Sequence, residues 1–75
     1  MEVVALNNDI ANVFGKNLLK ERQKKKLSQR AFAELCSMTN GDISKMENGK
    51  VNVTLKTVAH LANALEIPYY TLLKP

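Results

Sequence analysis

The sequence predicts an all-α fold, a compact bundle of five helices around one small core. Its 75 residues allow a single domain over residues 1–75, in which we expect residues 1–9 to form a poorly ordered N-terminal arm. Apolar residues recur three and four positions apart in successive stretches, which is typical of amphipathic helices. Ser, Thr, Asn or Asp precedes the main stretches, as at helix N-termini. Only residues 51–53 are β-prone, so no strand pair competes.

The first two predicted helices flank a lysine-rich segment. The first helix is capped by Asn8 or Asp9 and ends near Lys25, where consecutive lysines complement the negative end of the helix dipole. Its apolar face consists of Ile10, Val13, Phe14 and Leu18. Ser28 caps the second helix. The apolar positions of that helix are Phe32, Leu35 and Cys36.

The remaining three helices follow the same logic of caps and apolar spacing. Thr39 caps a third helix from Asn40 to about Asn48, which ends at Gly49 because glycine adopts a left-handed conformation without steric cost. Thr54 caps a fourth helix. The apolar face of that helix consists of Leu55, Val58, Ala59, Leu61, Ala62 and Leu65. After Pro68 the chain forms a short final helix.

Composition excludes several kinds of protein. The net charge of +4 fits a nucleic acid or an anionic membrane surface. With two Phe, two Tyr and no Trp, the chain lacks the aromatic cluster on which single-stranded bases stack. No apolar run approaches the roughly 20 residues that cross a bilayer. We therefore expect no membrane partner. One cysteine permits neither an internal disulfide nor a cysteine-based zinc site, so we expect no metal and a cytoplasmic location.

The segment from about Leu27 to Lys50 places two short helices on either side of a tight turn. A helix-turn-helix needs this arrangement, because the first helix braces the second while the second enters the major groove of DNA. If Ile43 and Met46 point into the core, the outward-facing side chains of the second helix are those of Asn40, Gly41, Ser44 and Lys45. Small polar groups can reach base edges, and a lysine can bind phosphate or guanine. A plain polar surface helix has the same pattern, so spacing alone leaves both interpretations open.

Motifs spread over most of the chain decide between them. The elements Leu27-Ser28-Gln29, Ile43-Ser44-Lys45-Met46-Glu47-Asn48-Gly49-Lys50 and Thr54-Leu55-Lys56-Thr57, at this separation, resemble the Cro and phage-repressor-like (XRE) helix-turn-helix family. The resemblance covers about residues 14–73. It implies a lambda-repressor-like DNA-binding domain that regulates transcription as a homodimer on a palindromic operator. The short length and the entry to the fourth helix resemble restriction–modification controller proteins in particular.

The resemblance also implies roles for individual residues. It assigns base reading to Asn40, Gly41, Ser44 and Lys45. It assigns contacts with the DNA phosphates to Gln29, Thr39, Asn48 and Lys50. Arg22 and Glu47 match a pair that commonly forms an internal salt bridge between the first and third helices. A contact of Arg22 with a DNA phosphate is the alternative role.

Several residues depart from the family pattern. Lys26 and Ser37 replace glycines at helix ends, where a left-handed side chain costs roughly 1 kcal/mol. Glu21 stands where an apolar residue is common, so we expect Leu18 and Leu19 to complete that face. Asp42 would be repelled by phosphate unless it accepts from a cytosine amine or stabilises its own helix N-terminus, and we favour the second role.

The C-terminal cluster of Tyr69, Tyr70, Leu72 and Leu73 is too large for one short helix to bury, and we expect a dimer contact or core closure there. A rival hypothesis is an antitoxin or interaction module whose main partner is another protein. An enzyme is disfavoured, because the chain has no nucleophile–base pair and no metal-ligand set. Cys36 is expected in the core and His60 on the surface. We expect no cofactor, and no small-molecule ligand is evident.

Overall fold

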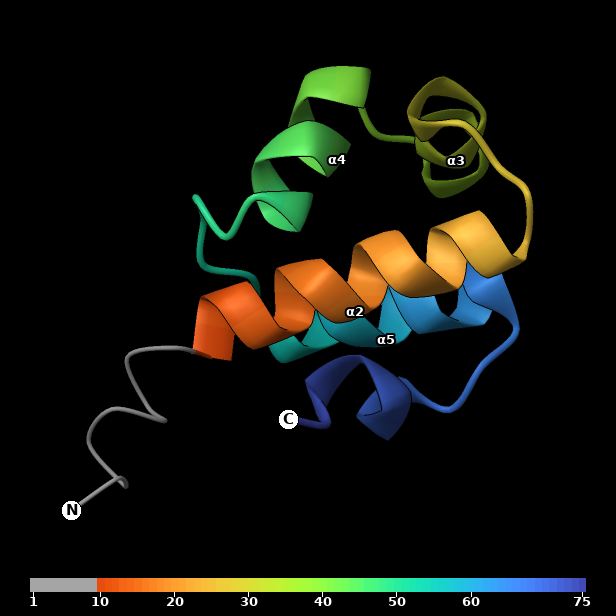
Figure 1. Cartoon of the computed structure of the whole chain (residues 1–75). Helices are drawn as coiled ribbons and strands as arrows, with labels where there is room; N and C mark the ends of the chain where they lie inside the picture. Colours follow the sequence, from red (N-terminus) through yellow and green to blue (C-terminus); the bar gives the residue numbers. More distant parts are fainter. Residues whose placement is uncertain (1–9) are drawn as a thin grey trace, which may run out of the picture.

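The computed structural model describes residues 10–75, which form four α-helices and one 3₁₀ helix (Figure 1). The elements are α2 (Ile10–Lys24), α3 (Gln29–Cys36), α4 (Asn40–Glu47), α5 (Leu55–Leu65) and the 3₁₀ helix η1 (Tyr69–Leu73). The all-α prediction is confirmed, but the fifth helix is a short 3₁₀ turn rather than an α-helix. The predicted caps Asn8 and Asp9 and the arm of residues 1–9 lie outside the described residues.

Helix α2 runs through the middle of the molecule. Figure 1 shows α3 and α4 on one side of α2 and η1 on the other, and α5 packs against α3 and η1. The helices α3 and α4 therefore form a pair in which α4 packs on α2 and α3 packs on α5. This is the arrangement that a helix-turn-helix requires.

Three predicted N-terminal caps are present. The side-chain oxygens of Ser28, Thr39 and Thr54 accept hydrogen bonds from backbone N–H groups three residues further along, at 3.0, 3.0 and 3.1 Å. Each bond satisfies one of the donors that a first helical turn leaves unpaired. The boundaries of α3, α4 and α5 therefore follow directly from local sequence chemistry.

The helix ends carry the predicted left-handed residues and one more. Lys26 and Ser37 have φ values of 59° and 56°, and Gly49 has 69°. Glu66, at the end of α5, also has a φ of 60°, which its sequence does not signal. For side chains other than glycine this conformation costs roughly 1 kcal/mol or more, so tertiary packing must hold these three turns.

One core joins all five elements. Phe32, Leu18, Ile43, Leu61, Leu65, Leu72 and Cys36 are its largest fully buried side chains. The prediction of Leu35 and Leu55 as core positions is wrong, since these side chains are 58% and 80% exposed. Helix α3 turns Phe32, Ala33 and Cys36 inward, which leaves Leu35 outside, and Leu55 is the first residue of α5, at the margin of the core.

The buried face of α2 contains Glu21 and is completed by Leu18 and Leu19, as expected. Leu18 is buried and Leu19 is half-buried. Glu21 itself is only 6% exposed, and its carboxylate lies 3.4 Å from the ammonium of Lys24. An acidic residue is accommodated at this position because a basic partner one turn further along reaches it.

His60 and Cys36 form a link between α5 and the end of α3. The imidazole Nε2 of His60 lies 2.9 Å from the carbonyl oxygen of Cys36. His60 is exposed, as predicted. Its ring nevertheless has a structural role, because it donates a hydrogen bond to a carbonyl oxygen that the C-terminus of α3 leaves unpaired. The thiol of Cys36 is buried in the core, and this burial raises its pKa.

A close approach of backbones joins α2 to the end of α4. A Cβ atom added to Gly15 would lie 2.5 Å from the carbonyl oxygen of Met46 and 2.7 Å from that of Glu47. Both neighbours are main-chain atoms, so they cannot rotate away. Only glycine permits α4 to lie this close to α2.

Two glycines in helices should therefore respond in opposite ways to the same substitution. Gly15→Ala should destabilise the fold by about 2 kcal/mol, because overpacking outweighs the better helix propensity of alanine. Gly41→Ala should be neutral or stabilise by up to about 1 kcal/mol, because the added Cβ meets only the Thr39 hydroxyl, at 3.8 Å. Urea unfolding followed by far-UV circular dichroism measures both. Equal effects of the two substitutions would contradict the close packing of α2 on α4.

Candidate nucleic-acid interface

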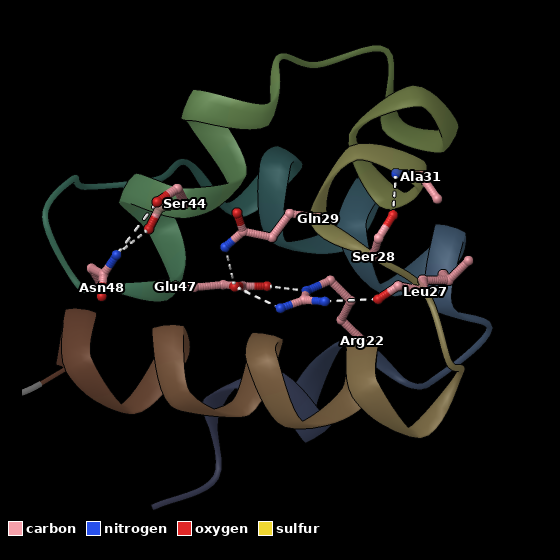
Figure 2. A network of polar contacts seen from close by, with 8 residues as sticks. All are labelled: Arg22, Leu27, Ser28, Gln29, Ala31, Ser44, Glu47 and Asn48. Carbon is pink, nitrogen blue, oxygen red and sulfur yellow. Dashed lines mark hydrogen bonds and ion pairs between the residues drawn. The ribbon is translucent and has the colours of Figure 1, made fainter.

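A network centred on Glu47 holds α2, α3 and α4 together (Figure 2). Arg22 donates from Nε to Glu47 Oε2 at 2.5 Å and from Nη2 to Glu47 Oε1 at 3.1 Å. A third guanidinium nitrogen, Nη1, donates to the carbonyl oxygen of Leu27 at 2.7 Å. The two charged side chains are only 10% and 4% exposed. A planar guanidinium bonded at both edges has little freedom, so this pair fixes the angle between the helices.

Gln29 is the third member of this network. Its Nε2 donates to Glu47 Oε1 at 2.9 Å, from the first residue of α3 (Figure 2). The amide group has two N–H donors, so one remains for a phosphate oxygen beside the N-terminus of α3. The bond to Glu47 could not be predicted from local sequence, since 18 positions separate the two residues. Gln29 is thus part of the scaffold as well as a candidate phosphate ligand.

Helix α4 turns its polar residues outward. Ile43 and Met46 are buried, Asn40, Gly41 and Lys45 are exposed, and Ser44 is half-buried. We call the surface of Asn40, Gly41, Ser44 and Lys45 the reading face. The structure therefore brings together on one helix the four residues expected to read bases.

Asp42 and Thr39 form a reciprocal cap at the start of α4. The Thr39 hydroxyl accepts from the Asp42 N–H at 3.0 Å, and the Asp42 carboxylate accepts from the Thr39 N–H at 3.3 Å. This is a capping box, which satisfies two backbone donors at once. It gives Asp42 the helix-stabilising role favoured above, and it leaves the O–H of Thr39 as a donor, because the hydroxyl oxygen only accepts in the capping box.

The opposite end of α4 is closed by Asn48. Its Nδ2 donates to the carbonyl oxygen of Ser44 at 2.9 Å and approaches the Ser44 hydroxyl at 3.5 Å (Figure 2). The chain then turns through Gly49, and the side chain of Lys50 is exposed directly after it. Asn48 and Lys50 therefore lie at the end of α4, where expected, with Lys50 as the cation.

The predicted C-terminal contact residues divide into two groups. Tyr69 and Tyr70 are 63% and 54% exposed, and their rings meet edge to face with centroids 5.9 Å apart. Leu72 is fully buried, so its assignment to a dimer interface is corrected: it closes the core against α2 and α5. Leu73 is half-buried. Core closure is thus confirmed at Leu72, and a dimer contact through the exposed Tyr69 and Tyr70 stays a prediction.

Sequence reasoning missed an apolar depression of about 350 Å³ at one end of the molecule. Its lining comes from the start of α2, the loop after α4, the start of α5 and the end of η1, including Ile10, Val53, Leu55 and Leu73. Leu55 and Ile10 are 80% and 49% exposed beside it. The only sequence signal was apolar residues in a loop, and nothing indicated that segments so far apart would meet.

Residues 10–75 contain neither a metal-binding cluster nor a membrane-spanning helix. No group of three His, Cys, Asp or Glu side chains there could hold a metal ion. Within the same range, no helix has the length and apolar character needed to span a bilayer.

Comparison with known proteins gives consistent matches. A helix-turn-helix family model matches residues 18–72. The hypothetical transcription factor NHTF from Neisseria superimposes with a TM-score of 0.86 and 29% identity, over 91% of this chain and 78% of that one. The restriction-modification controller protein C.AhdI from Aeromonas hydrophila has a TM-score of 0.80 and 34% identity, over 87% and 93%.

A third solved structure extends the same pattern. The clp gene regulator ClgR from C. glutamicum superimposes with a TM-score of 0.81 and 25% identity, over 85% of this chain and 83% of that one. A search among curated proteins finds no match.

The Glu47 network makes a prediction about stability. Arg22→Met or Glu47→Leu alone should destabilise the fold by about 3–5 kcal/mol, because each leaves a buried charge without its partner. The double substitution should recover part of that loss, since neither charge remains. Urea unfolding midpoints report both effects.

A surface ion pair provides the matched control. Lys25 Nζ lies 3.8 Å from Glu66 Oε1, and these side chains are 41% and 83% exposed. Lys25→Met should cost less than about 1 kcal/mol. If Arg22→Met costs no more than Lys25→Met, the network does not hold the three helices as described.

Proposed function

The chain belongs to the helix-turn-helix family of DNA-binding transcriptional regulators, and from this membership we propose that it recognises a specific duplex operator as a homodimer. The observation that carries the proposal is the presentation of α4. Its reading face is polar and open to solvent, while the Glu47 network and the close approach at Gly15 fix the helix from behind. A rigid polar helix on a convex surface suits the major groove.

The proposed contacts fall into two groups. Asn40, Gly41, Ser44 and Lys45 face base edges. A second group seats the domain on the DNA backbone: Gln29 through its remaining amide N–H, Lys50 through its charge, and Thr39 and Asn48 from the two ends of α4. Contacts of the second kind position a protein without selecting sequence.

A homodimer is proposed because the reading face is small. One protomer offers few side chains for base edges, and a second copy doubles them on a palindromic operator. In a two-fold complex both α4 helices face the same side of the duplex, with half-sites about one helical turn, or 34 Å, apart. The contact between protomers must then lie beside α4 rather than behind it.

This constraint bears on which surface mediates the dimer. The tyrosine pair belongs to η1, on the side of α2 away from α3 and α4 (Figure 1). A two-fold contact there would point the two reading faces apart. The apolar depression lies at the end of the molecule where α4 finishes, and it includes Leu73 from the predicted cluster. We therefore assign the dimer contact to the depression, with Leu55 and Ile10 as its exposed apolar side chains.

The similarity to C.AhdI supports a narrower proposal for the target genes. That protein is a restriction-modification controller, and the match spans 93% of its chain. We propose that this chain also controls a restriction–modification system. Genes for an endonuclease and a methyltransferase beside its own would support the proposal.

The tyrosine pair favours a second candidate function. Two exposed aromatic rings with Lys74 5.6 Å from the Tyr70 ring form a surface suited to another protein. An antitoxin or interaction module would use such a surface. Co-purification of a partner whose binding is lost in Tyr70→Glu would favour this function over operator binding alone.

Operator binding can be tested by selection from a random duplex pool and by salt titration. Wild type should enrich a palindromic motif and bind it less tightly as salt rises. Lys50→Ala should weaken binding to all sequences alike and reduce the log–log salt slope by about 0.9 per protomer. Lys74→Ala removes the same charge on the η1 side and should leave the slope unchanged. Equal affinity for selected and random duplexes would refute sequence-specific binding.

The dimer surface can be tested by sedimentation velocity. Leu55→Glu should shift the protein towards monomer, because it places a charge in an apolar contact, and the fold should survive because this side chain is 80% exposed. Tyr69→Glu introduces the same group on η1 and should leave the dimer intact. The reverse pattern would assign the dimer to the tyrosine pair instead.

A further inference from the structure

The reading face is divided into two halves that differ in hydrogen-bonding chemistry. Residues four apart share a side of a helix, so Asn40 pairs with Ser44 and Gly41 pairs with Lys45. The half of Asn40 and Ser44 carries both donors and acceptors. The half of Gly41 and Lys45 carries only the ammonium of Lys45, a group with three donors and no acceptor.

The two carboxylates of α4 both have partners within the fold. The carboxylate of Glu47 accepts from Arg22 and Gln29 and is 4% exposed, so it is withdrawn from the surface. Asp42 is exposed, and one of its carboxylate oxygens closes the capping box on the Thr39 N–H at the start of the helix. Neither carboxylate belongs to the half of Gly41 and Lys45, where the ammonium is the polar group.

Lys45, in contrast, is exposed and forms no ion pair within residues 10–75. Long helical side chains lean towards the N-terminus, so its stem lies over the turn that contains Gly41. The position of a Cβ on Gly41 is open apart from the Thr39 hydroxyl at 3.8 Å. A base edge can therefore approach this half closely, and the ammonium is the group that meets it.

Guanine is the base that matches a donor-only surface. In the major groove it presents two acceptors, N7 and O6, whereas cytosine presents a donor and adenine presents one acceptor beside a donor. Thymine presents a single acceptor, O4, beside its methyl group, so it offers the ammonium one bond where guanine offers two. We propose that Lys45 reads a guanine in each half-site and that cytosine is excluded from this position. The proposal rests on the operator binding proposed above and gives that operator a chemical requirement.

Selection from a random duplex pool with the full-length protein tests this directly. Wild type should enrich a guanine at one position in each half-site, and replacing it by adenine or 7-deazaguanine should weaken binding about tenfold. Lys45→Met should remove the preference at that position and leave the others. Lys45→Glu should replace guanine by cytosine there, because a carboxylate accepts from the cytosine amine.

Lys74→Met is the control, because it removes the same charge on the η1 side and should leave the motif unchanged. Failure of the proposal and failure of operator binding give different results. If wild type enriches no motif, both are overturned. If it enriches a motif that Lys45→Met leaves intact, or if the position sensitive to Lys45 is not guanine, the assignment of guanine to Lys45 alone is overturned.

Discussion

The buried ion pair between Arg22 and Glu47 is the interaction on which the remaining structure depends. A buried ion pair is weak evidence for stability, because desolvation of both charges offsets their attraction. In this protein the ion pair matters because it fixes the relative orientation of the helices. The guanidinium bonds Glu47 from α4 and the carbonyl of Leu27 before α3, and Glu47 in turn accepts from Gln29 on α3. Three helices therefore share one hydrogen-bonded network, and no buried side-chain nitrogen or oxygen in residues 10–75 lacks a partner. Any other angle between α3 and α4 would break several of these bonds together.

A second constraint on the position of α4 is steric rather than polar. Gly15 lets α2 approach the last carbonyl groups of α4 more closely than any side chain would allow. The ion pair fixes α4 through the side chain of Glu47, and the close approach fixes it through the backbone at the same residue. Two independent contacts at one end of an eight-residue helix explain how so short an element keeps a defined orientation. Isolated helices of this length are not stable in water, so tertiary contacts must provide the order.

Local chemistry made much of the fold predictable. Ser28, Thr39 and Thr54 began their helices as expected, because a cap depends on atoms only three residues away. The errors arose where distant segments meet. Leu35 and Leu55 fit the apolar period of their helices, yet the packing of each helix leaves them outside. The bond from Gln29 to Glu47 and the depression at Leu55 need the folded arrangement itself. For the candidate site, the sequence located the helix and its outward residues, but not which polar atoms the fold already uses.

Which atoms remain free determines how specificity can arise. The capping box and the Glu47 network engage the acidic groups of α4, so the reading face is sparse. The proposed homodimer would align two such faces on one operator. Helix α2 connects both requirements. Its second turn carries Gly15, which meets α4, and the adjacent Ala11 and Phe14 line the depression proposed as the dimer contact. In the proposed homodimer, one helix thus joins the reading face to the contact between protomers. The spacing between the half-sites of that dimer would follow from a rigid unit rather than from a flexible linker.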